Sequence, residues 1–424
     1  MIRWRSIAAV LVLSAAIATA QDVRLRVALD VGTCLRVRSE PRADAARVGC
    51  LAPGTSVTAL AAVPYWRQIE AAGVSGWVAK RFLVQDSVAA PVAIASARDD
   101  MWLAVHFVDV GQGDGIWIST PDDGIPGNGI YEGKNIVIDG GPDASDARNR
   151  MLQYLLDAGH PDALVDALVV THPHDDHYPG ALGILRHFDV ATIYEPGYPK
   201  RTASWLSFLA RAAAESALGR PTKLMSGRSE FATPAWGREL EAAFLWSYPG
   251  TPAGLGSRQN TIENNASIVL RLRYGEHTFL FMGDAEGKER DDPPDRVRYV
   301  EMRLLESLGD TGLAATVLKV AHHGSETSST LPFIAAVNPR IVVIQSGRRA
   351  FGGRFLPDGS VLARYCAHNP RLLILRTDQD DDLLGRSAAT DQDGDDIVIM
   401  TNGRELHVNV KVDGRPAEPR GCPP

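Results

Sequence analysis

The sequence feature that most constrains the fold is a histidine-rich stretch, Thr171–Gly180, that directly follows a short apolar run. Three imidazoles and two carboxylates fall within His172–His177. The apolar run Ala167–Val170 is typical of a buried strand, and Gly180–His187 can begin a helix. The cluster is therefore expected on a loop at the carboxyl end of a strand, where open α/β sheets place their chemistry. A solvated polar loop is the alternative. This density of imidazole and carboxylate favours a site for Zn²⁺, Mn²⁺ or Fe²⁺.

Three further apolar runs end on residues that can bind a metal. The residues at these strand ends are Asp139 after Lys134–Ile138, Asp284 after Thr278–Met282, and the pair His322 and His323 after Val317–Val320. Each signal is weak alone, since a Gly-Asp pair usually marks a turn. Their shared position at strand ends indicates one site assembled on a sheet scaffold from distant parts of the chain.

The first twenty residues have the pattern of a signal peptide. Arg3 and Arg5 are followed by the apolar stretch Ile7–Ile17 and the cleavage pattern Ala18–Ala20. The apolar stretch is short for a membrane span, so a retained N-terminal anchor is the alternative reading. The sequence thus predicts a periplasmic or secreted protein with no transmembrane segment after removal of the signal.

The mature chain is expected to be acidic. Removing Arg3 and Arg5 changes the formal net charge from −7 to −9. The protein therefore lacks the overall basic character of a nonspecific nucleic-acid binder. A polyanionic substrate would have to be held by local charge and by metal. The 424 residues are enough for two or three domains.

The four cysteines allow three disulfide pairings, and export permits disulfides. We favour Cys34–Cys50 and Cys366–Cys422, because each pair lies within one expected domain. Their spacing matches no common metal motif.

Residues 24–86 show several short strands separated by turn signals, as in a small all-β barrel. This stretch resembles a bacterial SH3-type domain; the residues that carry the likeness are Leu35–Pro41, Val48-Gly49, Pro53–Val57 and Gly76–Leu83. The resemblance implies a module that binds cell-wall peptide (peptidoglycan) or acts as a spacer. Trp66 and Trp77 could line a ligand groove, but we favour a place in the barrel core. Residues 87–100 are expected to be a linker.

From residue 101 onward the chain resembles the metallo-β-lactamase-fold hydrolases, and within them the hydrolase domain of ComEC-type competence proteins. The motifs that carry the resemblance are Phe107–Asp114, Ile138–Gly141, Thr171–His177, Asn264–Ser267, Met282–Glu286, Leu318–Ser325 and Ile344–Gly347. The resemblance implies an α/β fold, the αββα metallo-β-lactamase sandwich, over residues 101–415, preceded by the SH3-like barrel.

The same resemblance implies two divalent metal ions, zinc or manganese. His172 and His174 would bind one ion, and Asp176 and His177 the other. Asp284 would bridge them, and His323 would complete the second site.

The resemblance also suggests supporting residues. Asp176, His322 and Lys319 are the candidate catalytic residues. His322 would support the ligands or donate a proton, and Lys319 would donate to phosphate or, alternatively, point to solvent from its strand. The residues expected behind the ligands or against the substrate are Asp139, Asp109, Asn264, Asn265, Ser325 and Arg354, while Asp175 is expected to face solvent.

Two positions depart from the family pattern. The superfamily usually supplies a histidine to the first metal at the position where this chain has Asn264-Asn265. The competence-type relatives also have asparagines there. The first metal site is therefore expected to have fewer protein ligands. Phe351–Phe355 lacks a histidine found in many competence-type relatives, and Arg354 could replace it.

The favoured function is an exported binuclear phosphodiesterase or nuclease that uses a metal-bridging hydroxide, with single-stranded DNA as a candidate substrate. Hydrolysis of lactones, lactams or other carbon esters on the same metals is the second hypothesis. The third is a wall-binding protein whose hydrolase domain is secondary or inactive.

Overall fold

The structure, a computed structural model, describes residues 23–27, 35–41, 45–52, 54–63, 66–71, 73–79, 83–85, 101–122, 133–157, 164–217, 223–226, 235–237 and 239–422. The expected signal peptide 1–20 and linker 87–100 lie outside these residues, as does Cys34. In the described part, no helix combines the length and apolar character that crossing a bilayer requires.

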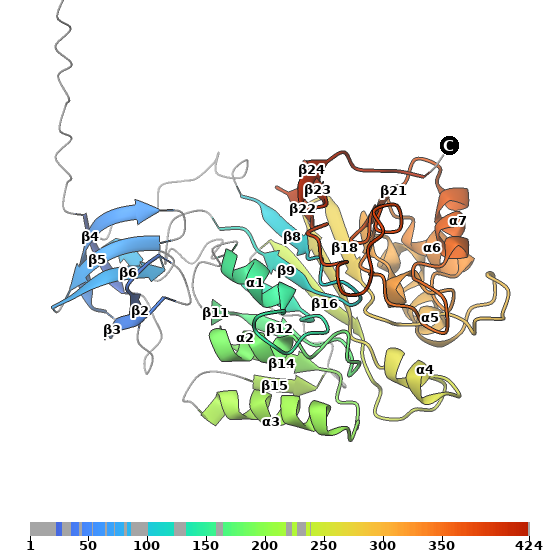
Figure 1. The fold of residues 1–424 in the computed structure, drawn as a ribbon, viewed down its shortest axis with the longest axis horizontal. Helices are drawn as coiled ribbons and strands as arrows, with labels where there is room; N and C mark the ends of the chain where they lie inside the picture. Colours follow the sequence, from blue (N-terminus) through green and yellow to red (C-terminus); the bar gives the residue numbers. More distant parts are fainter. Residues whose placement is uncertain are drawn as a thin grey trace, which may run out of the picture.

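The N-terminal part is a sheet of short antiparallel strands, drawn in blue in Figure 1. Its strands are β1 (Val23–Val27), β2 (Leu35–Arg38), β3 (Arg47–Leu51), β4 (Ser56–Val63), β5 (Trp66–Ala71), β6 (Val74–Ala79) and β7 (Leu83–Gln85), in the order β3-β2-β6-β5-β4-β1-β7. Alternating side chains such as Leu35 and Val37 on β2 enter a core of their own with Ile69 and Val78. This confirms the expected all-β module.

The two tryptophans do not belong to that core. Trp66 is buried and packs in a cluster whose other members come from the larger domain, and Trp77 lies partly buried against the same cluster. A guanidinium–carboxylate pair, Arg36 to Asp189 at 2.6 Å, also joins the two parts. Our preference for a place in the barrel core was therefore wrong for both residues, which instead contribute to the contact between domains.

The larger domain contains two facing sheets. The first has the order β15-β14-β12-β10-β9-β8-β22-β23-β24 in the described residues. Its strands are β8 (Leu103–Phe107), β9 (Ile116–Ser119), β10 (Asn135–Ile138), β12 (Ala167–Val169), β14 (Thr192–Glu195), β15 (Lys223–Ser226), β22 (Ile397–Thr401), β23 (Leu406–Val412) and β24 (Arg415–Ala417). The short strands β11 (Leu164–Val165) and β13 (Asp189–Val190) pair beside it.

The second sheet has the order β16-β17-β18-β19-β20-β21. Its strands are β16 (Leu240–Trp246), β17 (Val269–Tyr274), β18 (His277–Phe281), β19 (Val317–Lys319), β20 (Ile341–Ile344) and β21 (Leu373–Arg376). Strands β18 to β21 run parallel, so their carboxyl ends share one edge.

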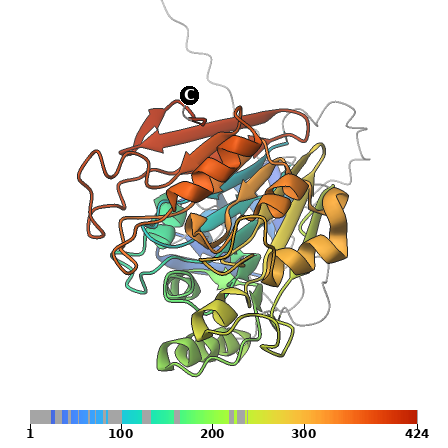
Figure 2. The ribbon, with the colours of Figure 1, turned by 90° about the vertical axis from the view of Figure 1, so that its right-hand side faces the viewer.

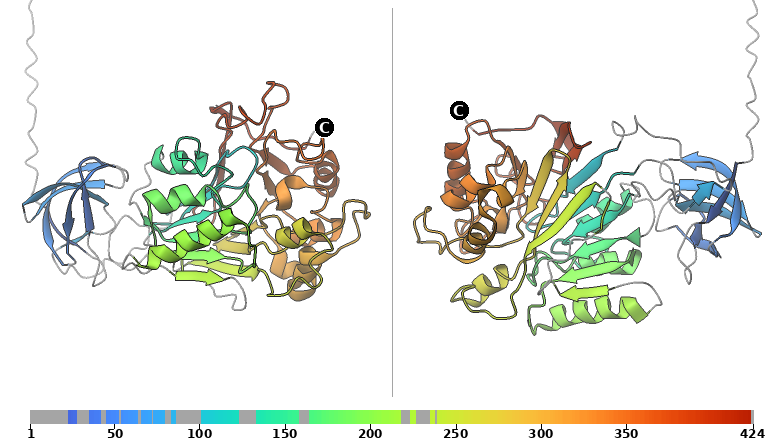
Figure 3. Two further views of the ribbon diagram at one scale, coloured as in Figure 1. Left: turned by 60° about the horizontal axis from the view of Figure 1, so that its bottom comes forward. Right: turned by 180° about the vertical axis from the view of Figure 1, so that it is seen from behind.

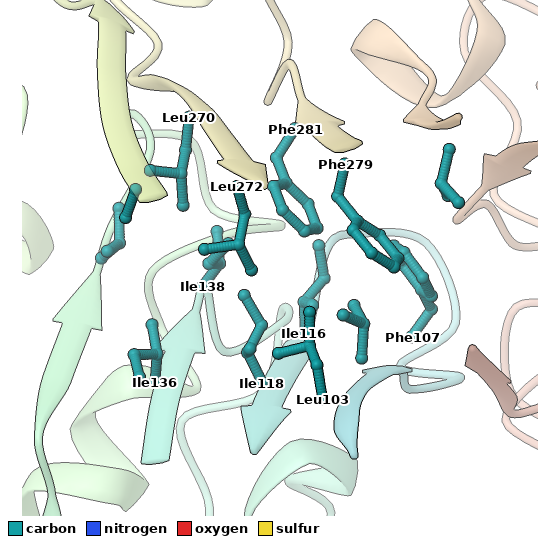
Figure 4. Close-up of a cluster of buried hydrophobic side chains, with 14 of the residues drawn as sticks. Leu103, Phe107, Ile116, Ile118, Ile136, Ile138, Leu270, Leu272, Phe279 and Phe281 are labelled. Atoms are coloured by element: carbon teal, nitrogen blue, oxygen red, sulfur yellow. The ribbon is translucent and has the colours of Figure 1, made fainter. Parts of the chain in front are cut away.

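Burial of both faces of these strands explains why their sequences are continuous apolar runs. Ile136 and Ile138 on β10 and Phe279 and Phe281 on β18 point into the space between the sheets, together with the residues labelled in Figure 4. The intervening Val137 packs on the outer face instead. Strands buried on both faces lose the apolar–polar alternation of a half-exposed strand.

Helices cover both outer faces, as Figures 2 and 3 show. The helices packed on the first sheet are α1 (Arg150–Asp157), α2 (Ala181–His187) and α3 (Ala203–Ala217). The helices packed on the second sheet are α5 (Tyr299–Leu313), α6 (Leu331–Val337) and α7 (Gly359–His368). The short helix α4 (Gln259–Asn264) and the 3-10 turn η3 (Ala321–Gly324) lie in connections between strands. The αββα sandwich expected from the sequence is confirmed.

The C-terminal disulfide is also confirmed. Cys366 on α7 is bonded to Cys422, with 5.5 Å between their Cα atoms. Cys50 is disulfide-bonded as well.

Candidate metal centre

The histidines and aspartates of the centre come from the ends of neighbouring strands. Strand β12 pairs in parallel with β10, with Val169 beside Ile138, so the loop after β12 begins next to Asp139. Strand β18 pairs in parallel with β19, with Phe281 beside Lys319, so Asp284 and His323 follow neighbouring strands. A backbone bond from Ile268 N–H to the Thr171 carbonyl, 2.9 Å, ties the two edges together.

The first group of candidate ligands is His172, His174 and Asp284, each of which offers an atom within 4.8 Å of the others. His172 Nε2 lies 3.1 Å from His174 Nδ1 and 3.6 Å from Asp284 Oδ2. His172 and Asp284 are buried, and His174 is partly exposed.

The second group is Asp176, His177 and His323. The Nε2 atoms of the two histidines are 3.3 Å apart, and Asp176 Oδ2 lies 3.5 Å from His323 Nε2. Two ligands about 2.0–2.1 Å from one tetrahedral ion stand roughly 3.3–3.4 Å apart. The spacing therefore fits a single divalent ion.

Asp284 also reaches the second group. Its Oδ1 lies 3.4 Å from His177 Nε2, and its Oδ2 lies 3.5 Å from His323 Nε2. Asp284 Oδ1 is buried with no hydrogen-bond partner in the described part of the chain. One carboxylate thus faces both groups, and the donor set fits two divalent ions.

The electrostatics of the centre suit metal binding. Burial and the neighbouring His177 keep the pKa of His172 well below its ordinary value, so this imidazole stays neutral, as a ligand must. Burial would raise the pKa of Asp284, but His323 and His177 hold it well below the ordinary value.

Asp139 lies directly behind His177. Its carboxylate accepts hydrogen bonds from the Thr171 backbone N–H (2.8 Å) and hydroxyl (2.6 Å) and from His177 Nδ1 (2.8 Å). Because Nδ1 donates to Asp139, the Nε2 lone pair of His177 is left for the centre. His323 is oriented in the same way, since its Nδ1 donates to the Gln345 carbonyl at 2.8 Å.

Asp114 is a residue of the centre that the sequence reasoning did not single out. It is buried, forms an ion pair with Lys319, and its Oδ1 lies 3.4 Å from His323 Nδ1. Its backbone N–H bonds to the Asp176 carbonyl at 3.3 Å. The motif Phe107–Asp114 contained it, but the sequence does not show that its partner would be Lys319. That lysine is only 1% exposed, and its ammonium is engaged by the Asp114 carboxylate.

His322 lies beside the centre and is partly exposed. Its Nδ1 is 3.2 Å from Glu286 Oε1 and 3.1 Å from the Thr327 hydroxyl. Glu286 is held in turn by Asn264 Nδ2 (2.9 Å) and, through its backbone N–H, by Asn265 Oδ1 (2.7 Å). The two asparagines therefore position Glu286, a residue that the sequence reasoning also missed.

His174 has a charged neighbour that was not expected. Its Nε2 lies 2.9 Å from Glu263 on α4, whose carboxylate also contacts Lys200 at 3.0 Å. With Nε2 engaged, Nδ1 is the atom of His174 that faces His172.

The remaining predicted residues lie apart from the ligands. Asp109 is buried and accepts hydrogen bonds from the backbone N–H groups of Gly111 (3.0 Å) and Gly394 (2.8 Å); burial raises its pKa to about 8. Ser325 is buried and accepts a hydrogen bond from Arg290 at 3.2 Å. Arg354 and Asp175 are exposed. Among the described residues, no hydrogen bond or ion pair joins the Arg354 side chain to the ligands.

Family models match both parts of the chain. Residues 130–348 match the model described as "Metallo-beta-lactamase superfamily". The chain belongs to the metallo-β-lactamase superfamily. Residues 34–84 match the model of the bacterial SH3 domain. Together with the histidine and aspartate groups, the family shows a metal-dependent hydrolase domain.

Curated relatives include one named for recombination and one named for the ComE operon. The chain is 25% identical to "Recombination protein 2" of Haemophilus influenzae over 58% of its own length and 24% of the relative's. It is 25% identical to "ComE operon protein 3" of Bacillus subtilis over 65% of this chain and 32% of the relative. The chain thus spans about a quarter to a third of these relatives.

Solved structures show weaker likeness. A diphosphatase from the PhnP family has a TM-score of 0.31 at 12% identity and covers 57% of this chain and 86% of its own. A metallo hydrolase from Ignicoccus hospitalis has a TM-score of 0.34 at 13% identity, covering 64% and 94%.

Proposed function

We propose that this protein is an exported, binuclear metal-dependent phosphodiesterase that acts on single-stranded DNA. The observation that carries the proposal is the position of Asp284, whose oxygens lie 3.6 Å from His172 and 3.4 Å from His177. A carboxylate shared by two ligand groups suits a pair of ions, and a pair of ions suits the in-line displacement at phosphorus.

The ligand roles follow from the two groups. His172, His174 and Asp284 would hold one ion, and Asp176, His177, Asp284 and His323 the other. Such ions lower the pKa of a bound water and neutralise charge on a phosphoryl oxygen. The first group has one protein ligand fewer, because Asn264 and Asn265 stand where the superfamily usually supplies a histidine, and both side chains contact Glu286. We therefore expect the first ion to bind more weakly.

The protein's own groups complete the proposal. His322 is the candidate proton donor to the leaving oxygen, because it is partly exposed and Glu286 and Thr327 orient its ring. Lys319 is better described as a positioning residue than as a donor to phosphate, since it acts on His323 through Asp114.

The relatives support a substrate among nucleic acids. One of them is named for recombination, a process that acts on DNA. The formal net charge of −9 after signal removal argues against broad nonspecific binding, so the strand would be engaged locally at the centre.

Export and wall contact are the second part of the proposal. The pattern of residues 1–20 supports export, and N-terminal sequencing of the secreted protein is expected to begin at Gln21. The SH3-like domain supports binding to peptidoglycan. Sedimentation with insoluble peptidoglycan tests this, and equal recovery in the supernatant with and without peptidoglycan would exclude it.

The test of activity uses mature protein loaded separately with zinc and with manganese. Single-stranded DNA, bis-p-nitrophenyl phosphate, a lactone and nitrocefin are offered as substrates. We expect cleavage of the two phosphodiesters, lost at least 100-fold in Asp284→Asn and retained in Asp175→Asn, which makes the same change at an exposed position of the histidine loop.

The other outcomes decide between hypotheses. Turnover of the lactone or nitrocefin alone would replace the proposal with a carbon-ester or lactam hydrolase. Absence of turnover on all four substrates by fully metallated protein would favour a binding role.

A further inference from the structure

A second group of carboxylates lies far from the histidines in the chain, in the long red connection between β21 and β22 (Figures 1 and 2). Asp381, Asp393 and Asp395 each offer one oxygen within 4.8 Å of the others. Gly394 adopts a φ of 95°, a conformation open mainly to glycine, and this turn lets the aspartates on either side face the same point.

These carboxylates are buried and poorly compensated. Asp381 and Asp395 are 0% exposed, and the Asp393 side chain is 7% exposed. In the described part of the chain, both oxygens of Asp381 and of Asp393 and Oδ2 of Asp395 have no hydrogen-bond partner. Buried carboxylates are normally paired or bound to a metal, whereas among the described residues these three carboxylates form only one ion pair, between Asp393 and Arg386.

The nearby basic side chains are engaged elsewhere. Three of them have carboxylates of their own: Arg376 with Asp378, Arg420 with Asp380, and Lys411 with Asp396. Arg386 Nε lies 2.7 Å from Asp393 Oδ2 but is not aligned for a hydrogen bond, and its other nitrogen pairs with Asp413. Asp381 and Asp395 form no ion pair in the described part of the chain, although Arg348, whose guanidinium lies over the Phe355 ring, is near enough for its charge to act on Asp381.

The donor atoms decide which ion would fit. An all-carboxylate set favours a hard cation over the transition metals that imidazole attracts. Ca²⁺–oxygen bonds of about 2.3–2.6 Å allow ligand oxygens to stand up to about 5 Å apart, whereas Mg²⁺ at about 2.1 Å limits them to about 4.2 Å. The three oxygens lie within 4.8 Å of one another, and calcium accommodates any spacing up to that limit.

We propose that Asp381, Asp393 and Asp395 bind one calcium ion that holds the loop 391–396 in place. The site would be structural, with ligands separate from those of the histidine-rich centre and with no part in the reaction proposed for it.

The loop fixed by this ion supports the turn that carries Asp114. Gly394 N–H and Asp395 N–H donate to Asp109 at 2.8 and 3.3 Å, and Gln392 Nε2 donates to the Val110 carbonyl at 2.8 Å. Calcium would thereby stiffen the backbone just before Asp114.

The experiment uses the full mature chain, stripped with EDTA and titrated with calcium chloride. The variants are Asp381→Asn with Asp395→Asn, and Asp382→Asn as a control, since Asp382 is exposed in the same turn. We expect saturable 1:1 binding by calorimetry and a Tm rise of about 5 °C at 1 mM calcium for the wild type and the control. The double variant should show neither, while its calcium-free Tm is at least that of the wild type, because repulsion between buried carboxylates is reduced.

The titration is repeated in Asp284→Asn, which disables the histidine-rich centre, and the calcium response should persist there. A wild type without saturable calcium binding would overturn the proposal, as would an equal calcium response in the double variant. If the double variant fails to fold, the single change Asp381→Asn is measured by the same calorimetry, and wild-type binding by it would likewise overturn the assignment.

Discussion

The change Asp139→Asn tests how the centre is oriented. Asp139 accepts three hydrogen bonds at 2.6–2.8 Å, two from Thr171 and one from His177 Nδ1. Asparagine has nearly the same shape but offers one acceptor oxygen and one donor nitrogen. It cannot accept from both sides, so each of its two orientations leaves a different fault.

In the first orientation the amide oxygen faces His177, and the amide nitrogen faces the Thr171 backbone N–H. A buried donor without an acceptor then costs about 1–3 kcal/mol of folding free energy. In the second orientation the amide nitrogen donates to His177 Nδ1. The ring proton must then move to Nε2, and the lone pair that should bind metal is lost.

In either orientation the negative charge behind His177 is lost, and this weakens metal binding by the second group. Loss of such a supporting carboxylate typically lowers metal affinity about 10–100-fold, or about 1.4–2.7 kcal/mol. We expect this decrease in the tighter of two zinc-binding steps, measured by competition with a chromophoric chelator. Asp175→Asn, an exposed change in charge, should bind as the wild type does. Affinities within twofold of the wild type for Asp139→Asn would refute the reasoning.

Three further predictions follow from buried groups. Lys319→Met leaves Asp114 as an uncompensated buried charge and should lower the free energy of unfolding, measured in urea, by about 3–5 kcal/mol. Adding Asp114→Asn should restore much of this stability. If the double variant is no more stable than Lys319→Met alone, the ion pair is not the cause. Burial, with a smaller effect of Lys411, lowers the pKa of His106 to about 4 from 6.5. As the pH falls below 6.5, His106 is therefore protonated in the unfolded chain before it is protonated in the folded one. The free energy of unfolding should fall by on the order of 2–3 kcal/mol between pH 6.5 and pH 4. In thermal melts, His106→Gln should reduce this dependence on pH. Phe281→Ala removes a ring from between the two sheets and should cost about 3–5 kcal/mol in urea; a loss below about 1 kcal/mol would contradict its place in that core.

Much of the fold could be predicted because its strands are local features. Apolar runs such as Val317–Val320 and Ile341–Ile344 are buried on both faces and are easily seen in a sequence. The histidine loop was predictable for a related reason, since its ligands are contiguous. Asp284 and His323 were found because each follows a strand directly.

The residues that were missed acquire their roles from distant partners. Asp114 depends on Lys319, and Glu263 depends on His174 and Lys200. No local pattern marks such a pair, because a carboxylate in a glycine-rich turn or on a short helix is usually exposed. The tryptophan contact between domains was missed for the same reason, since the pattern of a strand does not show what lies against its outer face.

The ligands of the second group come from both sheets, and this has a mechanical consequence. His177 follows a strand of one sheet and His323 a strand of the other, 146 residues apart in the chain. An ion held by both is a cross-link between the two halves of the sandwich, and it closes a loop that spans a third of the protein. Because both sheets must be in place for such an ion to bind, its removal should lower the free energy of unfolding of the whole sandwich.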